Sequence, residues 1–405
     1  MNDPLEKFSL PLPRWSTAAR NAILRPLDLW VCLRKSPARA TADPSRIRRL
    51  LLIKLFGLGD IVLILPTVKA LRQALPKTSV ALLTCGVRYE VFRQNPLFDR
   101  VIDWNPRGCV EWWQSLQQLK SEEFDVVLDL EERSLKGLII SAALGAPVRV
   151  GFVAERSRGR EVAYTHPVLC NPRQHMVHSF ADAVRMLVPI PPFDSLIPLP
   201  VGKEAQRRVD LFLRQFGVSR RPLVGIQAGI SPYNLAQRVW DLERFAAFAD
   251  GLIDDCNGAV VLTGSPEQAG LNQEILTRMH HPAVNAAGKL TMEETIALVS
   301  ACDLFLSSDT GTLHIAAAQG VPTIGLHGPE SSTRYGPFGP GNHGFYKWVP
   351  CSPCTRPEYG IIGGCSAKTC LRAIEPEEVL AKARAMLFAS AQRKPQVPDV
   401  RSQPA

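Results

Sequence analysis

The sequence has 405 residues and a hydrophobic content of 46%, enough for two domains with sizeable cores, which excludes a chain that is disordered throughout. Its formal net charge of +9 fits an anionic partner such as a nucleotide, a phosphorylated glycolipid or an anionic membrane. Nucleic acid is not expected, because no basic run with interleaved aromatic residues occurs. No apolar run reaches the ~20 residues of a membrane span and no signal peptide is evident, so we expect a cytoplasmic protein.

Residues 1–46 form a basic N-terminal extension with eight Lys and Arg against four Asp and Glu. Within it, Ile23, Leu27 and Trp30 fall at helical spacing, with arginine and lysine residues nearby. A basic amphipathic segment that carries tryptophan suits an anionic membrane surface. Alternatively, the extension packs against the body of the protein, since Pro26 interrupts the helical pattern.

Residues 47–195 alternate between short apolar runs and helical patterns, which is typical of a parallel sheet with right-handed crossovers. We expect strands at 50–55, 80–84, 101–104 and 124–130, a helix that ends near residue 75 and another at 135–144. Four prolines between residues 191 and 200 then indicate a linker.

Residues 196–390 repeat this architecture without repeating the sequence. We expect strands at 222–227, 259–263, 304–307 and 323–326, and helices at 242–252, 268–279, 292–300, 312–318 and 376–387. Residues 391–405 are expected to form a disordered tail. The fold class is therefore α/β, with two Rossmann-like domains that leave a central cleft between the carboxyl ends of their sheets, where open α/β folds bind ligands.

The first motif lies between the first expected strand and helix. Gly57 and Gly59 form a turn, but the third glycine of a dinucleotide fingerprint is replaced by Val62, so this turn is weak evidence for a dinucleotide. Asp60 is interpreted either as the N-cap of the helix or as a general base at the rim of the cleft. Lys54 lies inside an apolar strand, which is unusual because a buried ammonium needs a partner.

The run from Leu51 to Pro66 resembles the opening of the glycosyltransferase family that contains the ADP-heptose:lipopolysaccharide heptosyltransferases. The resemblance implies that Asp60 corresponds to the proposed catalytic base of that family and Lys54 to its lysine. Gly57 departs from the family, which often has serine there. The resemblance also implies the GT-B fold, in which two Rossmann-like domains face each other.

The second motif is Asp309-Thr310-Gly311, followed by His314, between an expected strand and helix. Threonine hydroxyls and the free N–H groups of a new helix suit a diphosphate, although a capped turn without a ligand is the alternative. The heptosyltransferase-like family carries Asp-Thr-Gly-x-x-His at the diphosphate of its nucleotide-sugar. The resemblance therefore implies that these four residues bind the donor.

Other donor residues are implied by the same resemblance, with two departures. Gly229 and Ser231 match a Gly-x-Ser loop, and Arg238 replaces a family lysine, which keeps the positive charge but changes its geometry. Asp241 stands where the family has proline. Glu267 lies near the position of an acidic residue that contacts the ribose, although a solvated loop carboxylate is an equal alternative.

The resemblance is thinner in the acceptor half. The stretch from Asp129 to Glu131 matches the family, and Arg133 is a candidate contact for an acidic acceptor in the cleft, together with Lys54, Gly57 and Gly59. His175 and His178 would share one helical face, where a metal pair is the minor alternative.

Four late cysteines form a dense cluster: Cys351, Cys354, Cys365 and Cys370. Two thiol pairs can supply four sulfur ligands to a structural zinc ion, although the ten-residue spacer is short. Structural thiols, reduced or disulfide-linked, and an iron–sulfur cluster are the alternatives. The other six cysteines are scattered, as expected of thiols in a reducing compartment.

These observations together predict an inverting glycosyltransferase that moves a sugar, expected to be heptose, from a nucleotide-activated donor such as ADP-heptose to a lipopolysaccharide-core or related glycan acceptor. No cofactor is expected to be required. A sugar-nucleotide epimerase of the same architecture is one alternative, and a non-catalytic protein that binds a glycolipid or a nucleotide is another. Formation of a new glycoside would separate the first interpretation from both.

Overall fold

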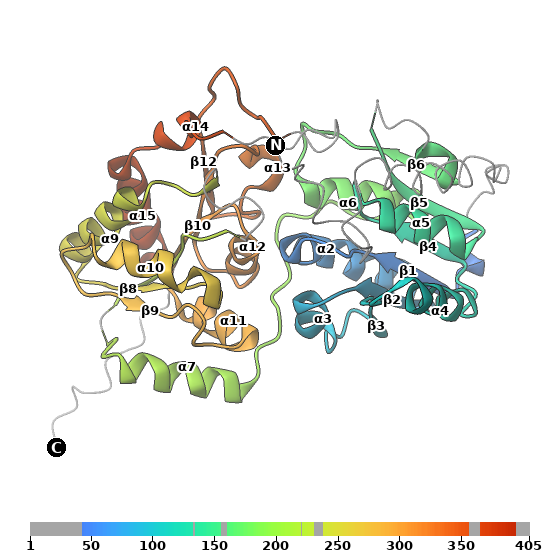
Figure 1. Ribbon diagram of the computed structural model, residues 1–405, viewed down its shortest axis with the longest axis horizontal. Helices are drawn as coiled ribbons and strands as arrows, with labels where there is room; N and C mark the ends of the chain where they lie inside the picture. The colour runs from blue at the N-terminus through green and yellow to red at the C-terminus, as the bar shows by residue number, and fades with distance from the viewer. Residues whose placement is uncertain are drawn as a thin grey trace.

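The computed structural model describes residues 43–132, 134–154, 160–219, 221–230, 238–355 and 365–393. They form two lobes, each built on a six-stranded sheet covered by helices (Figure 1). This confirms the predicted α/β class with two Rossmann-like halves. No helix in the described ranges is long and apolar enough to span a membrane.

The first sheet has the strand order β3-β2-β1-β4-β5-β6, and every neighbouring pair is parallel. Its strands are β1 (Arg49–Ile53), β2 (Ser79–Thr84), β3 (Arg100–Asp103), β4 (Val126–Asp129), β5 (Val148–Val153) and β6 (His166–Leu169). Its helices are α2 (Leu58–Ala74), α3 (Val87–Phe92), α4 (Cys109–Lys120), α5 (Leu135–Leu144) and α6 (Met176–Arg185), with short 3-10 turns at η2 (Pro44–Arg46) and η3 (Arg160–Ala163).

The second sheet has the order β12-β11-β10-β7-β8-β9 and is also parallel. Its strands are β7 (Leu223–Gln227), β8 (Ala259–Leu262), β9 (Val284–Asn285), β10 (Leu304–Ser308), β11 (Thr323–His327) and β12 (His343–Tyr346). Its helices are α7 (Lys203–Gln215), α9 (Leu242–Cys256), η4 (Pro266–Gln268), α10 (Ala269–Leu276), α11 (Met292–Ala301), α12 (Gly311–Ala318), α13 (Ser332–Tyr335), α14 (Thr369–Arg372) and α15 (Pro376–Arg393).

The central strands of both sheets are apolar because helices cover both of their faces. In β1, Leu50 to Ile53 are at most 1% exposed, and in β7 every residue is buried. Parallel strands buried on two faces read as continuous apolar runs, which is why both strands could be predicted from the sequence. The residues that directly follow each strand are still buried: Lys54 and Leu55 after β1, and residues 228–230 after β7.

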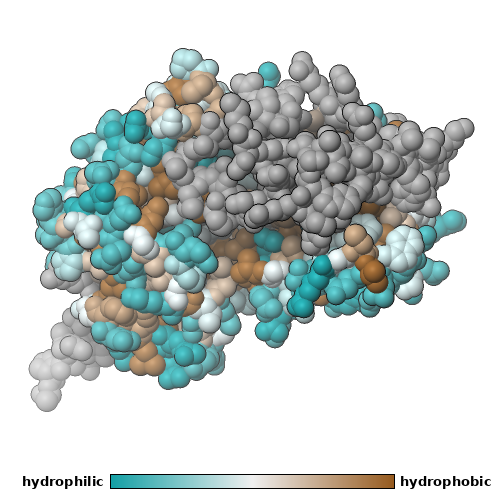
Figure 2. Space-filling view, viewed as in Figure 1, coloured by the Kyte–Doolittle hydropathy of each residue, from teal (hydrophilic) through white to brown (hydrophobic). Residues whose placement is uncertain are grey.

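The two lobes touch through α2 of the first and α12 of the second, and α2 also packs against α6. The segment between α6 and α7 runs between the lobes (Figure 1). In the space-filling view, hydrophilic residues cover most of the described surface of the second lobe (Figure 2). The carboxyl ends of β1 and β10, where the two motifs lie, are joined to the helices that meet at this interface.

Several boundaries differ from expectation or stay open. The last helix continues to Arg393, so residues 391–393 do not belong to the predicted disordered tail. The rest of that tail and residues 1–42 of the basic extension lie outside the described residues. The division between the two domains at residues 195 and 196 stays a prediction.

Candidate active site between the two lobes

The turn after β1 places Asp60 in the first turn of α2. This helix begins at Leu58, and its N-cap is Gly57, whose φ of 78° is a left-handed conformation that glycine adopts without strain. A Cβ on Gly57 would lie 2.5 Å from Oδ2 of Asp60, so the missing side chain also leaves room for that carboxylate. Because Gly57 is the cap residue, the capping interpretation of Asp60 is wrong.

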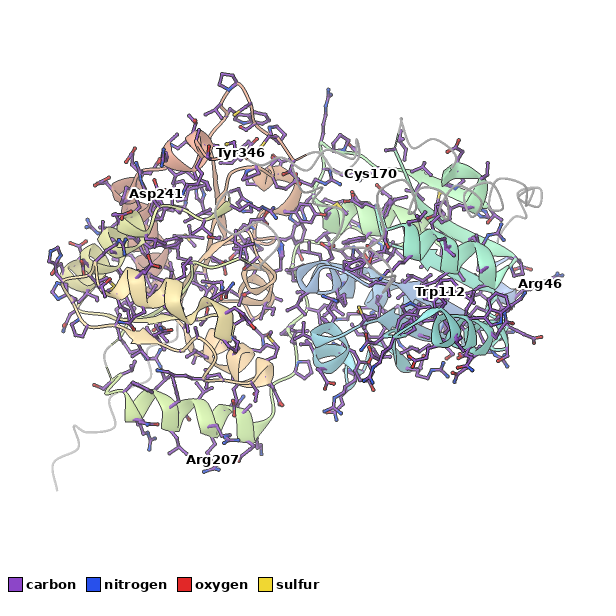
Figure 3. The ribbon with its side chains drawn as sticks, viewed as in Figure 1. Arg46, Trp112, Cys170, Arg207, Asp241 and Tyr346 are labelled. Carbon is purple, nitrogen blue, oxygen red and sulfur yellow. The ribbon has the colours of Figure 1, made fainter. Side chains whose placement is uncertain are left out.

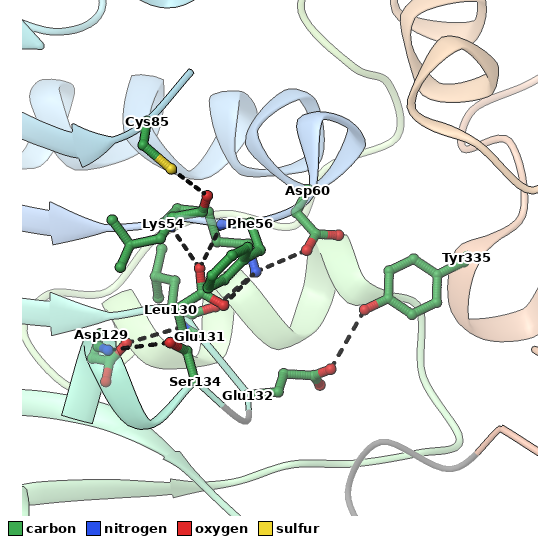
Figure 4. Close-up of polar contacts among 12 residues, drawn as sticks. Lys54, Phe56, Asp60, Cys85, Asp129, Leu130, Glu131, Glu132, Ser134 and Tyr335 are labelled. Carbon is green, nitrogen blue, oxygen red and sulfur yellow. Dashed lines mark hydrogen bonds and ion pairs between the residues drawn. The ribbon is translucent and has the colours of Figure 1, made fainter. Parts of the chain in front are cut away.

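Lys54 has the partners that its burial requires. The side chain is almost fully buried, and its Nζ lies 2.8 Å from Oδ2 of Asp60 and 3.6 Å from Oε2 of Glu131 (Figure 4). It also donates a hydrogen bond to the carbonyl of Leu130 at 3.3 Å. Burial disfavours the ammonium, but the two carboxylates outweigh this effect and raise the pKa of Lys54 above its usual range. Lys54 therefore stays charged and holds one oxygen of Asp60.

Glu131 ties this network to the main chain. Its Oε1 accepts hydrogen bonds from the N–H groups of Leu55 at 2.6 Å and Phe56 at 2.9 Å, directly after β1. Burial raises the pKa of Glu131, while Lys54 and the two N–H groups act in the opposite direction. No role was expected for Glu131 from the sequence. The one indication of such a role was its position, directly after the apolar run that predicts a central strand.

Residues of both lobes meet beside this network. Glu132 of the first lobe forms an ion pair with Arg334 of α13, and its Oε2 accepts a hydrogen bond from the Tyr335 hydroxyl at 3.4 Å (Figure 4). The thiol of Cys170, which follows β6, also lies 3.0 Å from Oε1 of Glu132, on the side of the molecule where α13 sits (Figures 1 and 3). The predicted acceptor contact Arg133 lies outside the described residues.

The N-termini of α2 and α12 approach each other closely. A Cβ on Gly59 would overlap the His314 ring and lie 3.1 Å from Cα of Gly311. Gly59 and Gly311 are therefore needed for this approach, which is a stronger reason for both glycines than the turn geometry that the sequence suggested. The motif at Asp60 and the motif at Asp309 thus face each other across the interface.

The turn from Asp309 to Thr310 leads into α12. Arg238 pairs with Asp309, with Nη2 and Oδ2 2.5 Å apart. Thr310 is the N-cap, but its side chain makes no capping hydrogen bond and lies instead 3.0 Å from the hydroxyl of Ser307. The first N–H groups of α12 therefore carry the partial positive charge of a helix start without a side-chain cap, which suits an anion.

Two of the remaining predicted donor residues, Gly229 and Glu267, lie in the segments that follow β7 and β8. Gly229 is buried and packs over Gln268, which a Cβ on Gly229 would approach to 2.7 Å. Gln268 accepts a hydrogen bond from Gln227 at 3.0 Å, beneath this loop. Glu267 is exposed at the start of η4, and Ser231 lies outside the described residues.

His175 and His178 join the lobes. His175 is the N-cap of α6 and not a helical residue, so the two side chains do not share a helical face as expected. Nε2 of His175 lies 2.9 Å from the carbonyl oxygen of Gly336, and both imidazole rings contact the Phe338 ring, with centroids 4.9 and 5.5 Å apart. Burial lowers the pKa of His175 to about 3, so this contact is made by a neutral ring.

The four late cysteines are free thiols, and all four take part in electrostatic interactions with one another. Burial and the nearby thiols of Cys365 and Cys351 raise the pKa of Cys354, and burial raises that of Cys370. Within the described ranges, no group of three or more His, Cys, Asp or Glu side chains is arranged to hold a metal ion. The zinc site at Cys351, Cys354, Cys365 and Cys370 therefore stays a prediction.

Two buried polar residues near Asp309 were not expected from the sequence. His327 ends β11 and is fully buried, and Glu330 follows it at 5% exposure. Burial lowers the pKa of His327 to about 4 and raises that of Glu330 to about 8, so both are largely neutral near pH 7. In the sequence, His327 stands at the end of an apolar run and Glu330 shortly after it, and this position was their only signal.

Comparison with known proteins identifies the family. The sequence model described as glycosyltransferase family 9 (heptosyltransferase) matches residues 112–359, more than half of the chain. The chain belongs to glycosyltransferase family 9. The resemblance drawn from the motifs is confirmed, and the protein is a glycosyltransferase. The matched range contains β4 to β12 and thus Glu131 and the donor turn at Asp309, whereas Asp60 precedes it.

Relatives within this family agree in sequence and in fold. A Haemophilus influenzae protein named lipopolysaccharide core heptosyltransferase OpsX is 26% identical over 300 residues, which cover 72% of this chain and 82% of that protein. A glycosyltransferase family 9 structure from Veillonella parvula covers 86% of this chain and all of its own, with a TM-score of 0.70 and 21% identity. The structure named E. coli ADP-heptose lps heptosyltransferase II gives a TM-score of 0.66 at 20% identity, covering 85% of this chain and 99% of its own. The predicted GT-B arrangement is confirmed.

Proposed function

We propose that this family 9 glycosyltransferase transfers heptose from ADP-heptose to an acceptor of the lipopolysaccharide core, with inversion at the anomeric carbon. The family description and the name of the Haemophilus relative support heptose and the lipopolysaccharide core. The name of the E. coli structure supports ADP-heptose as the donor. A single observation carries the catalytic assignment: the carboxylate of Asp60, fixed by Lys54, lies next to the interface where α2 meets the N-terminus of α12.

The proposed reaction is one displacement. Asp60 takes the proton from an acceptor hydroxyl while that oxygen attacks the anomeric carbon of the donor. The bond between this carbon and the diphosphate oxygen breaks, and its electron pair leaves with the diphosphate. Attack from the face opposite the diphosphate inverts the configuration. The negative charge that develops on the leaving group is stabilised by the N–H groups at the start of α12 and by Arg238.

Lys54 and Glu131 are proposed to position the base. Because Lys54 binds Oδ2 of Asp60, only Oδ1 is open to accept the acceptor proton. Glu131 in turn fixes Lys54 through its own bonds to the Leu55 and Phe56 N–H groups. A carboxylate held in one orientation loses little conformational entropy when the acceptor binds, and that preorganisation is part of its catalytic effect.

The test is a transfer assay with the full-length chain. The protein is mixed with ADP-heptose and a panel of truncated core oligosaccharides, and products are measured by mass spectrometry. We expect one acceptor to gain one heptose while ADP is released in equal amount. ADP-heptose consumed or isomerised without any new glycoside would favour an epimerase, and donor binding with no turnover across the panel would favour a non-catalytic binding protein. Either result would remove the proposal.

The site of action is proposed to be the cytoplasmic face of the membrane that carries the acceptor. The net charge of +9 supports contact with an anionic surface. The segment predicted to make this contact lies within residues 1–46, most of which are outside the described residues. Co-sedimentation of the full-length chain with anionic but not with neutral vesicles is expected, and equal sedimentation with both would contradict it.

A further inference from the structure

Two buried imidazoles close to the donor turn lack hydrogen-bond partners that buried groups normally have, and a buried carboxyl group lies near them. Both ring nitrogens of His327 and Nδ1 of His314 have no partner within the described part of the chain. Glu330 accepts one hydrogen bond there, from the N–H of Ser331 at 3.3 Å. Most buried polar groups in native proteins are paired, so exceptions that gather at one place need an explanation.

The three side chains lie at adjacent carboxyl ends. Strands β10 and β11 pair in parallel with Ser308 opposite Leu326, which puts Asp309 beside His327. Asp309 and Arg238 act electrostatically on both His327 and Glu330, so all four are near neighbours. Gly325 is required here, because a Cβ at that position would lie 2.6 Å from Nε2 of His327. The chain thus leaves room for this imidazole beside the donor turn.

His314 extends this group toward the base. It lies on α12, is 3% exposed, and the charges of both Asp309 and Asp60 act on it. A sugar joined to a diphosphate at the start of α12 must lie within a few ångströms of that helix, and its anomeric carbon must be within reach of an acceptor oxygen held by Asp60. The unpartnered groups therefore lie buried on the side of the interface where the transferred sugar has to sit.

The charge of these groups indicates which part of the donor they suit. Burial lowers the pKa of both imidazoles, which keeps them neutral, and raises the pKa of Glu330, which leaves it largely protonated at pH 7. The diphosphate is an anion, and Arg238 and the α12 N-terminus already match it. Neutral groups that can both donate and accept suit sugar hydroxyls, which also do both.

We infer that His327 and Glu330, with His314, form the subsite that reads the hydroxyl groups of the transferred sugar. This inference rests on the proposed function, since it requires a nucleotide-sugar with its diphosphate at α12. A site built to hydrogen-bond substrate hydroxyls rejects analogues that lack them, because its buried polar groups then stay unpaired. His327 and Glu330 are thus specificity-determining residues for the donor.

The test compares ADP-heptose with ADP by calorimetric titration of the full-length chain. We expect the parent protein to bind ADP-heptose more tightly than ADP. His327→Phe and Glu330→Leu are each expected to weaken ADP-heptose about 3- to 10-fold, the range for a neutral hydrogen bond, and to leave ADP unchanged. Glu330→Gln is expected to behave like the parent, because the amide is a neutral group of the same shape. Ser141→Ala, which alters a fully buried hydroxyl without a partner in α5 of the first lobe, is the matched control and should change neither affinity.

The outcomes separate this inference from the proposed function. Equal weakening of ADP and ADP-heptose in both variants would mean that the residues shape the nucleotide pocket as a whole, and would overturn the inference while the proposed donor stands. Equal affinity of the parent protein for ADP and ADP-heptose would also overturn it. If the parent protein binds neither ligand, the proposed function itself fails.

Discussion

The two halves of the candidate site differ in how completely their polar groups are paired. Around Asp60, each buried charge has a partner: Lys54 lies between two carboxylates, and Glu131 accepts two main-chain hydrogen bonds. Around Asp309, His327 is as deeply buried, but neither of its ring nitrogens has a partner within the described residues, and Glu330 accepts one hydrogen bond, from the N–H of Ser331. A paired network holds its own geometry, whereas an unpaired one gains its partners from a ligand.

The difference matches what each half is proposed to do. A general base must already be oriented when the acceptor arrives, so its environment is completed by the protein. A donor pocket must distinguish one nucleotide-sugar from another, so its polar groups remain open for the substrate. Substitutions in the two halves should therefore have different consequences.

The largest contrast is expected in stability. Lys54→Met leaves the Asp60 and Glu131 carboxylates without their buried cation and should lower the free energy of unfolding by about 3–5 kcal/mol. His327→Phe removes a fully buried group that has no partner among the described residues and should lower it by less than ~1 kcal/mol. Urea unfolding of both variants measures the difference. The double variant Lys54→Met, Glu131→Gln should recover part of the loss, and similar losses in both single variants would show that the two halves are not different.

The glycine contact between the lobes should matter for activity but not for folding. Gly59→Ala places a methyl group against the His314 ring and should separate α2 from α12, which we expect to lower kcat/KM by about 10²-fold, as for a misplacement of ~1 Å. Gly270→Ala in α10 is the matched control, because nothing lies within 4 Å of the added Cβ. Unchanged activity of Gly59→Ala with a normal melting curve would show that this approach is not part of the productive geometry.

Removal of the donor cation should weaken binding. Arg238→Ala is expected to lower affinity for ADP about 10- to 100-fold, the range for a charged hydrogen bond, and Arg238→Lys should recover most of it. Adenosine should bind both variants as it binds the parent, because the proposed contact is to phosphate. Equal losses for adenosine and ADP would instead indicate that the loop around Arg238 is disturbed.

A further contrast is expected in the pH dependence of stability. Burial raises the pKa of Glu330 to about 8 from 4.5, so the folded state binds this proton more tightly than the unfolded state. Its contribution to stability is complete below pH ~4.5 and is lost as the pH rises toward 8, with a slope of at most about 1.4 kcal/mol per pH unit. Above pH ~7.5 the buried histidines are largely neutral in both states and add little slope. Urea unfolding should show this decline in the parent and not in Glu330→Gln; the same decline in both would place the proton elsewhere.

The sequence predicted the parts of the fold that rest on local signals. Continuous apolar runs identified β1 and β7, and the motif at Asp309 identified the start of α12. No strand was predicted at β6, a four-residue edge strand, or at its inner neighbour β5, because strand formation there depends on packing that no local pattern carries. The predicted strand at 124–130 is longer than β4, which covers Val126–Asp129. Leu130 continues the apolar run, but its carbonyl already accepts a hydrogen bond from Lys54.

The site could be predicted only where one motif contained its residues. Asp60 and Lys54 are six residues apart, and the need of a buried ammonium for a partner pointed to such a pair. Glu131 completes the pair from 77 residues away, through the parallel pairing of β1 with β4, which no local pattern encodes. Arg334 matters through its ion pair with Glu132 of the other lobe, and His327 through the pairing of β10 with β11; neither relation is local in the sequence.

The central claim is that Asp60 is the base of the transfer, and single-turnover kinetics of Asp60→Asn at saturating ADP-heptose tests it most directly. Asparagine keeps the shape of the side chain but cannot take the acceptor proton. We predict that the rate falls by about 10²–10⁴-fold while the affinity for ADP-heptose stays within a factor of about three of the parent protein. A rate near that of the parent, with the donor bound normally, would contradict the claim and place the base elsewhere in the cleft.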